Sequence, residues 1–358
     1  MIGTRIKLAR KKAGLSLRGL ADALGGKVSA QAIGKYERDE MAPSSGVLLA
    51  LSKALGVSLS YLMDSQGIEL KHVDFRTKAN TTGKDRAQVE TAVIEWIERY
   101  LQIERILELD SAEWDAPILP PKQLATVEEA EELANEVKEK WNLGHDPIPN
   151  MTELLEEKGL KVLVEELPTR VSGFTCLVKR SGNQADLPVV VVNKNVSLER
   201  RRLTLAHELA HRVIAPDGLD EKAVEKAANY FAGAFLMPGE HVRREAGKHR
   251  SQFGYNELIG LKRLYRASGA ALLVRLKNLG IINESSLIYA FQTYACGWRS
   301  AEPVELEAQE ERGEREKPRR FERLCYRALA EGLISLAKAA ELLRSPIEEV
   351  EAGLKGPK

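Results

Sequence analysis

The sequence is poor in cysteine and contains no long apolar run. Its three cysteines, Cys176, Cys296 and Cys325, are far apart and match no metal-binding or disulfide spacing. We therefore expect free thiols in a reducing compartment. No apolar run approaches the roughly 18–20 residues that cross a bilayer, and the first residues lack the apolar core of a secretory signal. These absences predict a cytoplasmic protein that does not bind a membrane.

An excess of one charge is also missing, because the formal net charge is +1 over 358 residues. No global charge therefore points to nucleic acid, and any basic patch must be local. A hydrophobic fraction of 44% and a charged fraction of 29% are typical of globular protein rather than disorder. At about 100–200 residues per domain, the length predicts two or three domains.

Hydrophobic periodicity predicts a mainly α fold of the α+β class, in four regions. The first, 1–66, is predicted to be an all-helical domain. Residues 67–120 are interpreted as a linker and a helical seam. Residues 121–285 combine helices with a small three-stranded sheet, and 286–358 form a helical C-terminal region with a charged linker.

The helical seam is predicted because apolar residues recur at alternating spacings of four and three. At about three heptads, the pattern is marginal for a free-standing coiled coil. Two alternatives stay open, which are packing on a neighbouring part of the chain and dimerisation. The seam residues are Val89, Val93, Trp96, Tyr100, Ile103 and Leu107.

Three short β-rich runs, at 161–167, 173–180 and 187–193, are broken by Pro, Gly and Asn and predict strands. A charged helix precedes them and is predicted to begin at a cap formed by Thr126. The charge-dense run 301–320 is interpreted as a solvated linker.

The run LTLAHELAHRV places two histidines, His207 and His211, four residues apart, with Glu208 directly after the first. Positions i and i+4 lie on one face of a helix, so two imidazoles there can hold one Zn²⁺ at about 2.0–2.1 Å. Glu208 is then predicted to act as the general base that takes a proton from water. The alternative is an ordinary amphipathic helix with two histidines on one side.

Catalytic zinc takes three protein ligands and keeps one position open. We predict Glu225 as the third ligand, because it begins a later helix whose apolar residues would pack on the first. Glu221 and Asp220 are its rivals. Asn229 lies one turn after Glu225 and is predicted to accept a hydrogen bond from a ligand histidine, which would fix its tautomer.

Other polar residues carry weaker signals. No stabiliser of the transition state is identifiable; Tyr230 is the nearest donor, and a packed aromatic ring is the favoured interpretation. His72, His145, His241 and His249 are interpreted as surface histidines.

The run PVVVVNKNVSLERRRLTLAHELAHRV, followed by EKAANYFAGAFLMP, resembles the ImmA/IrrE family of bacterial zinc metallopeptidases over about residues 125–285. The resemblance implies a minimal zincin-like domain with zinc at His207, His211 and Glu225, and with Glu208 as general base. Members of this family share one property, which is that they cleave a partner repressor or help to inactivate it. A partner regulator, or the chain's own tether at 65–86, is therefore the expected substrate.

A local basic excess marks the first 38 residues, where nine Lys and Arg face two acids, a difference of +7. Such an excess is what phosphate contacts require. Short helices joined by Gly-containing turns predict a helix-turn-helix, in which Ser29 and Gln31 begin the helix that enters the major groove. Gln pairs with adenine. The predicted DNA contacts are Arg10, Arg18, Ser29, Gln31, Lys35 and Arg38.

Residues 15–62 resemble the XRE family of phage-repressor-like domains, which implies a lambda-repressor-like fold and binding to double-stranded operator DNA. One departure is Asp39, where the family often has glycine after the Glu-Arg pair. That difference is expected to alter the turn after the recognition helix without changing the fold.

Together these patterns predict a sequence-specific transcriptional regulator that binds operator DNA as a homodimer and carries a zinc metalloendopeptidase domain. In a second interpretation, the zinc site is structural or sensory and not proteolytic. In a third, the protein acts like an antitoxin by binding a partner protein.

Overall fold

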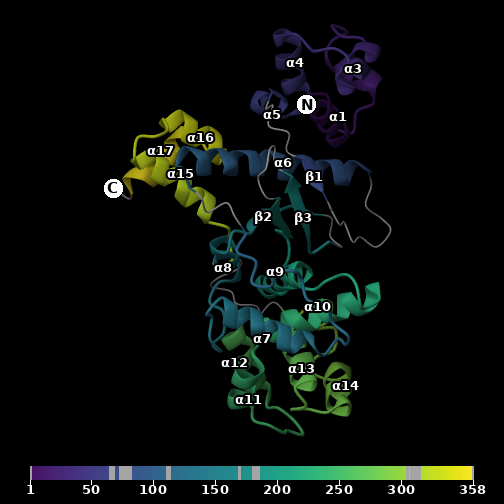
Figure 1. The fold of residues 1–358 in the computed structure, drawn as a ribbon, viewed down its shortest axis with the longest axis vertical. Coiled ribbons are helices and arrows are strands. Elements are labelled where there is room, and N and C mark those ends of the chain that lie inside the picture. The colour runs from purple at the N-terminus through teal and green to yellow at the C-terminus, as the bar shows by residue number, and fades with distance from the viewer. Residues whose placement is uncertain are drawn as a thin grey trace. The chain divides into compact units, whose positions relative to one another are not determined.

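The computed structural model describes residues 2–63, 69–71, 83–109, 114–167, 171–179, 186–303, 306 and 316–356. The chain divides into two compact units. The first unit comprises Met1–Trp114, Gly159–Val191 and Arg319–Lys358, and the second comprises Asp115–Lys158 and Val192–Pro318. The described elements are mainly helical with one small sheet, which confirms the predicted fold class (Figure 1). The four predicted domain ranges stay a prediction.

Five short helices open the first unit and enclose a core around Ile6, Leu20, Ile33 and Leu51, all fully buried. Serine side chains cap the second and third of these helices. The hydroxyl oxygen of Ser16 accepts from the backbone N–H of Gly19 at 2.9 Å, and that of Ser29 from Ala32 at 3.2 Å. The helices are α1 (Ile2–Lys12), α2 (Leu17–Ala23), α3 (Ala30–Glu37), α4 (Ser45–Leu55) and α5 (Leu59–Met63).

Asp39 follows α3 and has a φ of 55°, in the left-handed region that glycine adopts most easily. Aspartate tolerates this conformation better than most residues, because its short polar side chain bonds locally. Here one carboxylate oxygen accepts from the N–H of Gly3 at 2.8 Å. The departure from the XRE pattern therefore keeps the turn and adds a tie between the end of α3 and the start of α1.

Helix α6 (Gly83–Ile106) is the long helix of the first unit. It carries five of the six predicted seam residues, the sixth, Leu107, follows directly after it, and all six are buried. They share one apolar core with the strands and with the C-terminal helices α15 (Arg320–Ala330), α16 (Leu336–Leu343) and α17 (Ile347–Lys355) (Figure 1). Packing within the chain is thus the observed use of the seam. A homodimer would need a different surface.

The sheet has the strand order β1-β3-β4-β2. The three predicted strands are confirmed, and β1 pairs antiparallel to β3 with Glu69 opposite Lys179. Strand β1 lies in the region 67–120, where the sequence predicted a linker and a helix but no strand, because three residues are too short to show an alternating pattern. The strands are β1 (Glu69–Lys71), β2 (Lys161–Glu165), β3 (Gly173–Lys179) and β4 (Leu187–Asn193). Most of the suggested tether at 65–86 lies outside the described residues.

The second unit is built of helices, with α10 packed between α7 and α9. The rings of Phe231 and Phe235 stack in its core with centroids 5.5 Å apart. The helices are α7 (Ala130–Lys140), α8 (Met151–Glu157), α9 (Leu198–Val213), α10 (Glu221–Leu236), α11 (Gly239–Ala246), α12 (Tyr255–Tyr265), α13 (Gly269–Asn278) and α14 (Glu284–Gln292).

Two expectations for this unit were wrong. Helix α7 begins at Ala130 rather than after Thr126, because the preceding residues form turns in which the N–H of Ala130 bonds to the carbonyl of Val127. The run 301–320 is not solvated throughout, since Glu316 is fully buried. Within the part of the chain that the structure describes, no helix is long and apolar enough to cross a membrane.

Candidate metal centre and nucleic-acid interface

Helix α9 carries the HELAH motif and is fixed at both ends. At its start, the Ser197 hydroxyl accepts from the N–H of Arg200 at 3.3 Å. At its end, Lys122 forms an isolated parallel bridge with Ile214, donating its N–H to the carbonyl of Val213 at 2.8 Å. The bridge lies three residues after His211, so it holds the end of the helix that carries the two histidines in place.

Helix α10 presents the acidic partner. A carboxylate oxygen of Asp220 accepts from the N–H of Ala223 at 2.7 Å and caps the helix, while Glu221 is exposed in its first turn. These two rivals are therefore a cap and a surface residue. Glu225 lies one turn further along, on a helix whose apolar face, including Ala228, packs on α9.

Donor groups of three residues converge between the two helices. The Nε2 atoms of His207 and His211 are 3.1 Å apart. The Glu225 carboxylate places Oε2 at 3.5 Å from Nε2 of His207 and Oε1 at 3.3 Å from Nε2 of His211. Among the described residues, these three form the group of His, Cys, Asp or Glu side chains that could hold a metal ion.

The donor triangle fits the geometry of zinc. Ligand atoms at about 2.0–2.1 Å from a tetrahedral Zn²⁺ are separated from one another by about 3.3 Å. The two imidazole nitrogens are 3.1 Å apart, and each lies 3.3 or 3.5 Å from a different oxygen of the Glu225 carboxylate, so the closest approaches are near that value. The histidine side chains are 17% and 10% exposed and that of Glu225 is 37% exposed, so solvent reaches the centre. Three protein donors and an accessible side are the arrangement of catalytic rather than structural zinc.

Glu208 follows His207 on α9 and is only 7% exposed. This carboxylate lies next to the predicted metal ligand His207 in sequence without belonging to the three residues that converge. That placement suits a group which moves a proton rather than one which binds the ion.

Asn229 uses its side chain within its own helix, where Nδ2 donates to the carbonyl of Glu225 at 2.8 Å. The hydrogen bond predicted between Asn229 and a ligand histidine stays a prediction. Tyr230 is half-buried, and burial together with the nearby Glu131 raises the pKa of its hydroxyl. Two of the charged groups near it, Glu131 and Arg275, form an ion pair with each other.

The prediction that four histidines lie at the surface is confirmed at two positions and wrong at one. His145 and His249 are exposed, as predicted. His241 is buried, and its Nδ1 lies 2.8 Å from the hydroxyl of Tyr265. His72 lies outside the described residues.

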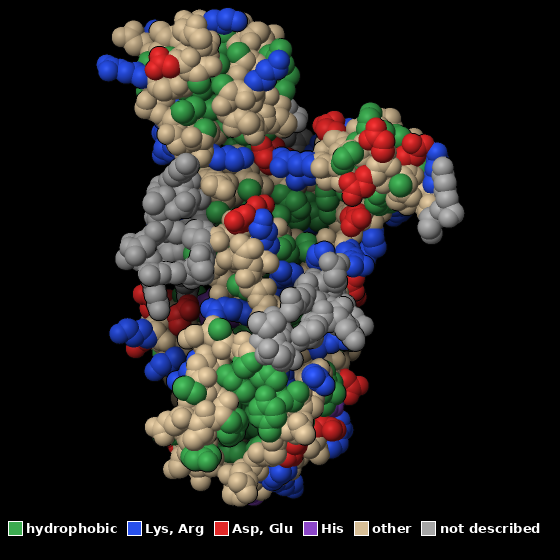
Figure 2. Space-filling model, turned by 180° about the vertical axis from the view of Figure 1, so that it is seen from behind, with side chains coloured by type: hydrophobic (Ala, Val, Ile, Leu, Met, Phe, Trp, Pro, Cys, Tyr) green, Lys and Arg blue, Asp and Glu red, His purple; other side chains and the backbone are tan. Residues whose placement is uncertain are grey.

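On the helix-turn-helix domain, the predicted base-contacting residues of α3 are exposed. Ser29, Gln31 and Lys35 all lie on its solvent side, and Arg18 is exposed on α2. Figure 2 shows Lys and Arg side chains projecting from this part of the molecule. The chain therefore offers cations and a glutamine on the surface where a groove would lie.

Two of the nine Lys and Arg residues among the first 38 positions form ion pairs within the first unit. Arg10 forms a paired contact with the Glu37 carboxylate, at 2.5 and 2.9 Å, and donates to the carbonyl of Leu15. Arg5 is buried against Glu98. Arg10 therefore ties α1 to α3, and this geometry disfavours the DNA contact predicted for it. Arg38 is exposed and pairs with Glu40 in solvent.

Sequence reasoning missed a second set of polar residues, at the start of α9. Arg202 is fully buried and pairs with Glu316, and Glu199 is buried and pairs with Lys262. The sequence offers one signal, which is that charged residues occupy core-facing positions in an otherwise apolar helix. It gives no indication of their partners.

Comparison with known families agrees with both halves of this description. Residues 155–277 match the model of the IrrE N-terminal-like domain, a peptidase family, and residues 6–62 match the helix-turn-helix model. Searches of curated proteins and of solved structures return no match. The chain thus joins a helix-turn-helix DNA-binding domain to an IrrE-like, metallopeptidase-type domain.

Proposed function

We propose that this fusion of a helix-turn-helix and an IrrE-like domain is a transcriptional regulator whose second domain is a zinc-dependent peptidase. The observation that carries the proposal is the convergence of His207, His211 and Glu225, whose donor groups approach one another to 3.1 to 3.5 Å. The substrate is a partner regulator or the chain itself, cleaved in response to a signal.

The proposed chemistry assigns one task to each residue. His207, His211 and Glu225 would hold the ion. Zinc, when bound, supplies Lewis acidity that lowers the pKa of water to about 7. Glu208 accepts the proton of the attacking water and can return it to the leaving amine. Its burial limits the rotamers available to the carboxylate.

We expect one zinc per chain in the wild type and none in His207→Ala, because two donors at this spacing no longer close the site. Metal content measured by plasma mass spectrometry, on protein purified without a chelator or a metal-binding tag, tests this. His249→Ala is the matched control, since His249 is exposed and outside the triangle. Wild type that stays free of zinc after the metal is added back would overturn the proposal.

For the first domain we propose that α3 reads operator DNA. Gln31 stands two residues after the Ser29 cap, where the N-terminal turn of a recognition helix meets base edges. Lys35 lies one turn further on the exposed side and is suited to a phosphate.

Gln31→Ala is expected to relax base preference at one operator position and to cost about 1–3 kcal/mol there. Lys35→Ala should instead weaken binding to all sequences and lower the salt slope by about one. An operator selected in vitro, titrated at several salt concentrations, separates the two effects. Lys53→Ala, an exposed lysine on α4, serves as control. Equal losses on operator and random DNA for Gln31→Ala would contradict a reading role.

A further inference from the structure

The first half of α9 is charged but buried, although it leads directly into the metal ligands. Glu199 and Arg201 are each 5% exposed and Arg202 is 0% exposed. Burial lowers the pKa of the Arg202 guanidinium, and the Glu316 carboxylate opposes that shift. An ion buried this deeply is tolerated only with a well-placed partner. The position of α9 therefore depends on the residues that neutralise these charges.

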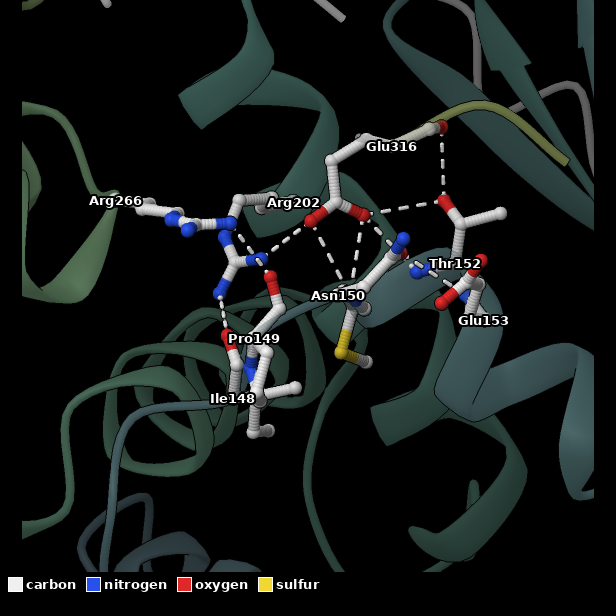
Figure 3. A network of polar contacts seen from close by, with 9 residues as sticks. Ile148, Pro149, Asn150, Thr152, Glu153, Arg202, Arg266 and Glu316 are labelled. Carbon is white, nitrogen blue, oxygen red and sulfur yellow. Dashed lines mark hydrogen bonds and ion pairs between the residues drawn. The ribbon is translucent and has the colours of Figure 1, made fainter. Parts of the chain in front are cut away.

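Glu316 provides the countercharge for Arg202 and is itself completely buried (Figure 3). Its carboxylate pairs with the guanidinium and also accepts from the N–H groups of Met151 and Thr152, at 3.1 and 3.0 Å, and from the Thr152 hydroxyl at 3.2 Å. Arg202 donates in addition to the carbonyl of Ile148 at 2.6 Å. This single carboxylate joins α9 to the residues that begin α8.

A second acid from the same part of the sequence holds the preceding turn of α9. Lys262 bonds to Glu199 at 2.5 Å and to Glu302 at 3.3 Å, and all three side chains are buried. Glu302 also accepts from the N–H of Ala270 at 3.1 Å. Glu302 and Glu316 both lie beyond the family-matched residues 155–277. The chain therefore uses acids from outside its recognisable peptidase region to fix the helix that carries HELAH.

We infer that Glu316 is a positioning residue of the zinc centre, acting through Arg202 on the placement of His207 and His211. The inference rests on the proposed function. Arg202 lies five residues before His207 on one continuous helix. Without the Glu316 carboxylate, the first half of α9 must shift to bring the guanidinium to water. Zinc donors tolerate displacements of only about 0.2 Å, so such a shift weakens the site.

The test is zinc affinity of the full-length protein, measured by competition with a fluorescent chelator. Glu316→Gln should weaken zinc binding by about 10- to 100-fold, the usual loss when a group supporting the metal ligands is removed. Glu284→Gln is the matched control, because it removes a carboxylate from an exposed pair with Lys277 and should leave the affinity unchanged. An affinity within twofold of wild type for Glu316→Gln, at lowered thermal stability, would assign Glu316 a merely structural role.

A double variant tests whether Glu316 acts through Arg202. Adding Arg202→Met to Glu316→Gln removes the uncompensated charge, so the double variant should bind zinc more tightly than Glu316→Gln alone. A further loss in the double variant would overturn the coupling. Wild type that binds no zinc would overturn the proposed function, whereas tight wild-type binding with an unaffected Glu316→Gln overturns this inference alone.

If Glu316→Gln does not fold, the coupling between Glu316 and the zinc centre can still be tested in the wild-type protein. Coupling between Glu316 and the zinc centre is reciprocal. Zinc should therefore slow hydrogen exchange at the N–H groups of Met151 and Thr152, which donate hydrogen bonds to Glu316. The N–H of Ala271, bonded to the Ser268 hydroxyl in the same unit, is the control. If zinc slowed exchange equally at all three N–H groups, the specific link between Glu316 and the zinc centre would be refuted.

Discussion

Glu208→Gln should abolish peptide hydrolysis by the zinc-loaded protein while leaving its zinc content unchanged. Glutamine has nearly the same shape as glutamate but cannot take the proton of the attacking water, and loss of a general base typically costs about 10²–10⁴-fold in rate. The three donors of the metal triangle are untouched, since Glu208 is not among them. Turnover of a quenched fluorescent peptide library, together with metal analysis of the same sample, measures both quantities.

The matched control is Glu221→Gln, which changes an exposed glutamate at the start of α10. Its turnover and its zinc content should equal those of the wild type. If wild type binds zinc but cleaves neither the library nor itself, the sensory or structural interpretation replaces the proteolytic one. Glu208→Gln that retains full activity would show that the proton is taken by another group.

Local patterns account for most of what the sequence predicted correctly. A serine cap and the first turn of its helix lie within three residues, so Ser16 and Ser29 are predictable from sequence alone. The convergence of His207 and His211 follows in the same way from the period of one helix. Glu225 was harder, because its placement depends on how α10 packs against α9. The apolar face of α10 gave enough information to favour it over Asp220 and Glu221.

Contacts between distant residues account for what was missed. Arg202 and Glu316 are 114 positions apart, and Glu316 stands in a run where charged residues are so dense that none is distinguishable as buried. The burial of His241 is equally non-local, since Tyr265, its hydrogen-bond partner, is on a different helix. Strand β1 exists through its pairing with β3 rather than through any pattern of its own.

The α6 seam shows how one pattern can have two physical uses. Alternating spacings of four and three specify an apolar stripe on a helix, but not what covers it. In this chain the stripe is covered by the sheet and by α15–α17. The C-terminal helices, to which the sequence assigned no role, therefore complete the core of the first unit.

Gly3→Ala should be among the most disruptive single changes in the helix-turn-helix domain. A Cβ at Gly3 would lie 2.3 Å from the carbonyl oxygen of Tyr36 and 2.8 Å from that of Glu37. Both are backbone atoms at the end of α3, so neither can rotate away. Helix α1 would have to separate from α3, at an overpacking cost of about 1–3 kcal/mol, and the bond from the Gly3 N–H to Asp39 would be strained or lost.

Hydrogen exchange of α1–α3 in the full-length protein measures this effect, and we expect exchange there to accelerate by about 10- to 100-fold, as the free-energy cost implies. Gly46→Ala is the matched control. Apart from its own helix, nothing among the described residues lies within 4 Å of a Cβ at that position, and alanine favours the helix by up to about 1 kcal/mol. Operator affinity should fall for Gly3→Ala, because α3 carries the residues proposed to read DNA and loses its support from α1. Equal protection in the two variants would mean that α1 accommodates the methyl group, and that the close approach of Gly3 to α3 does not hold the recognition helix in place.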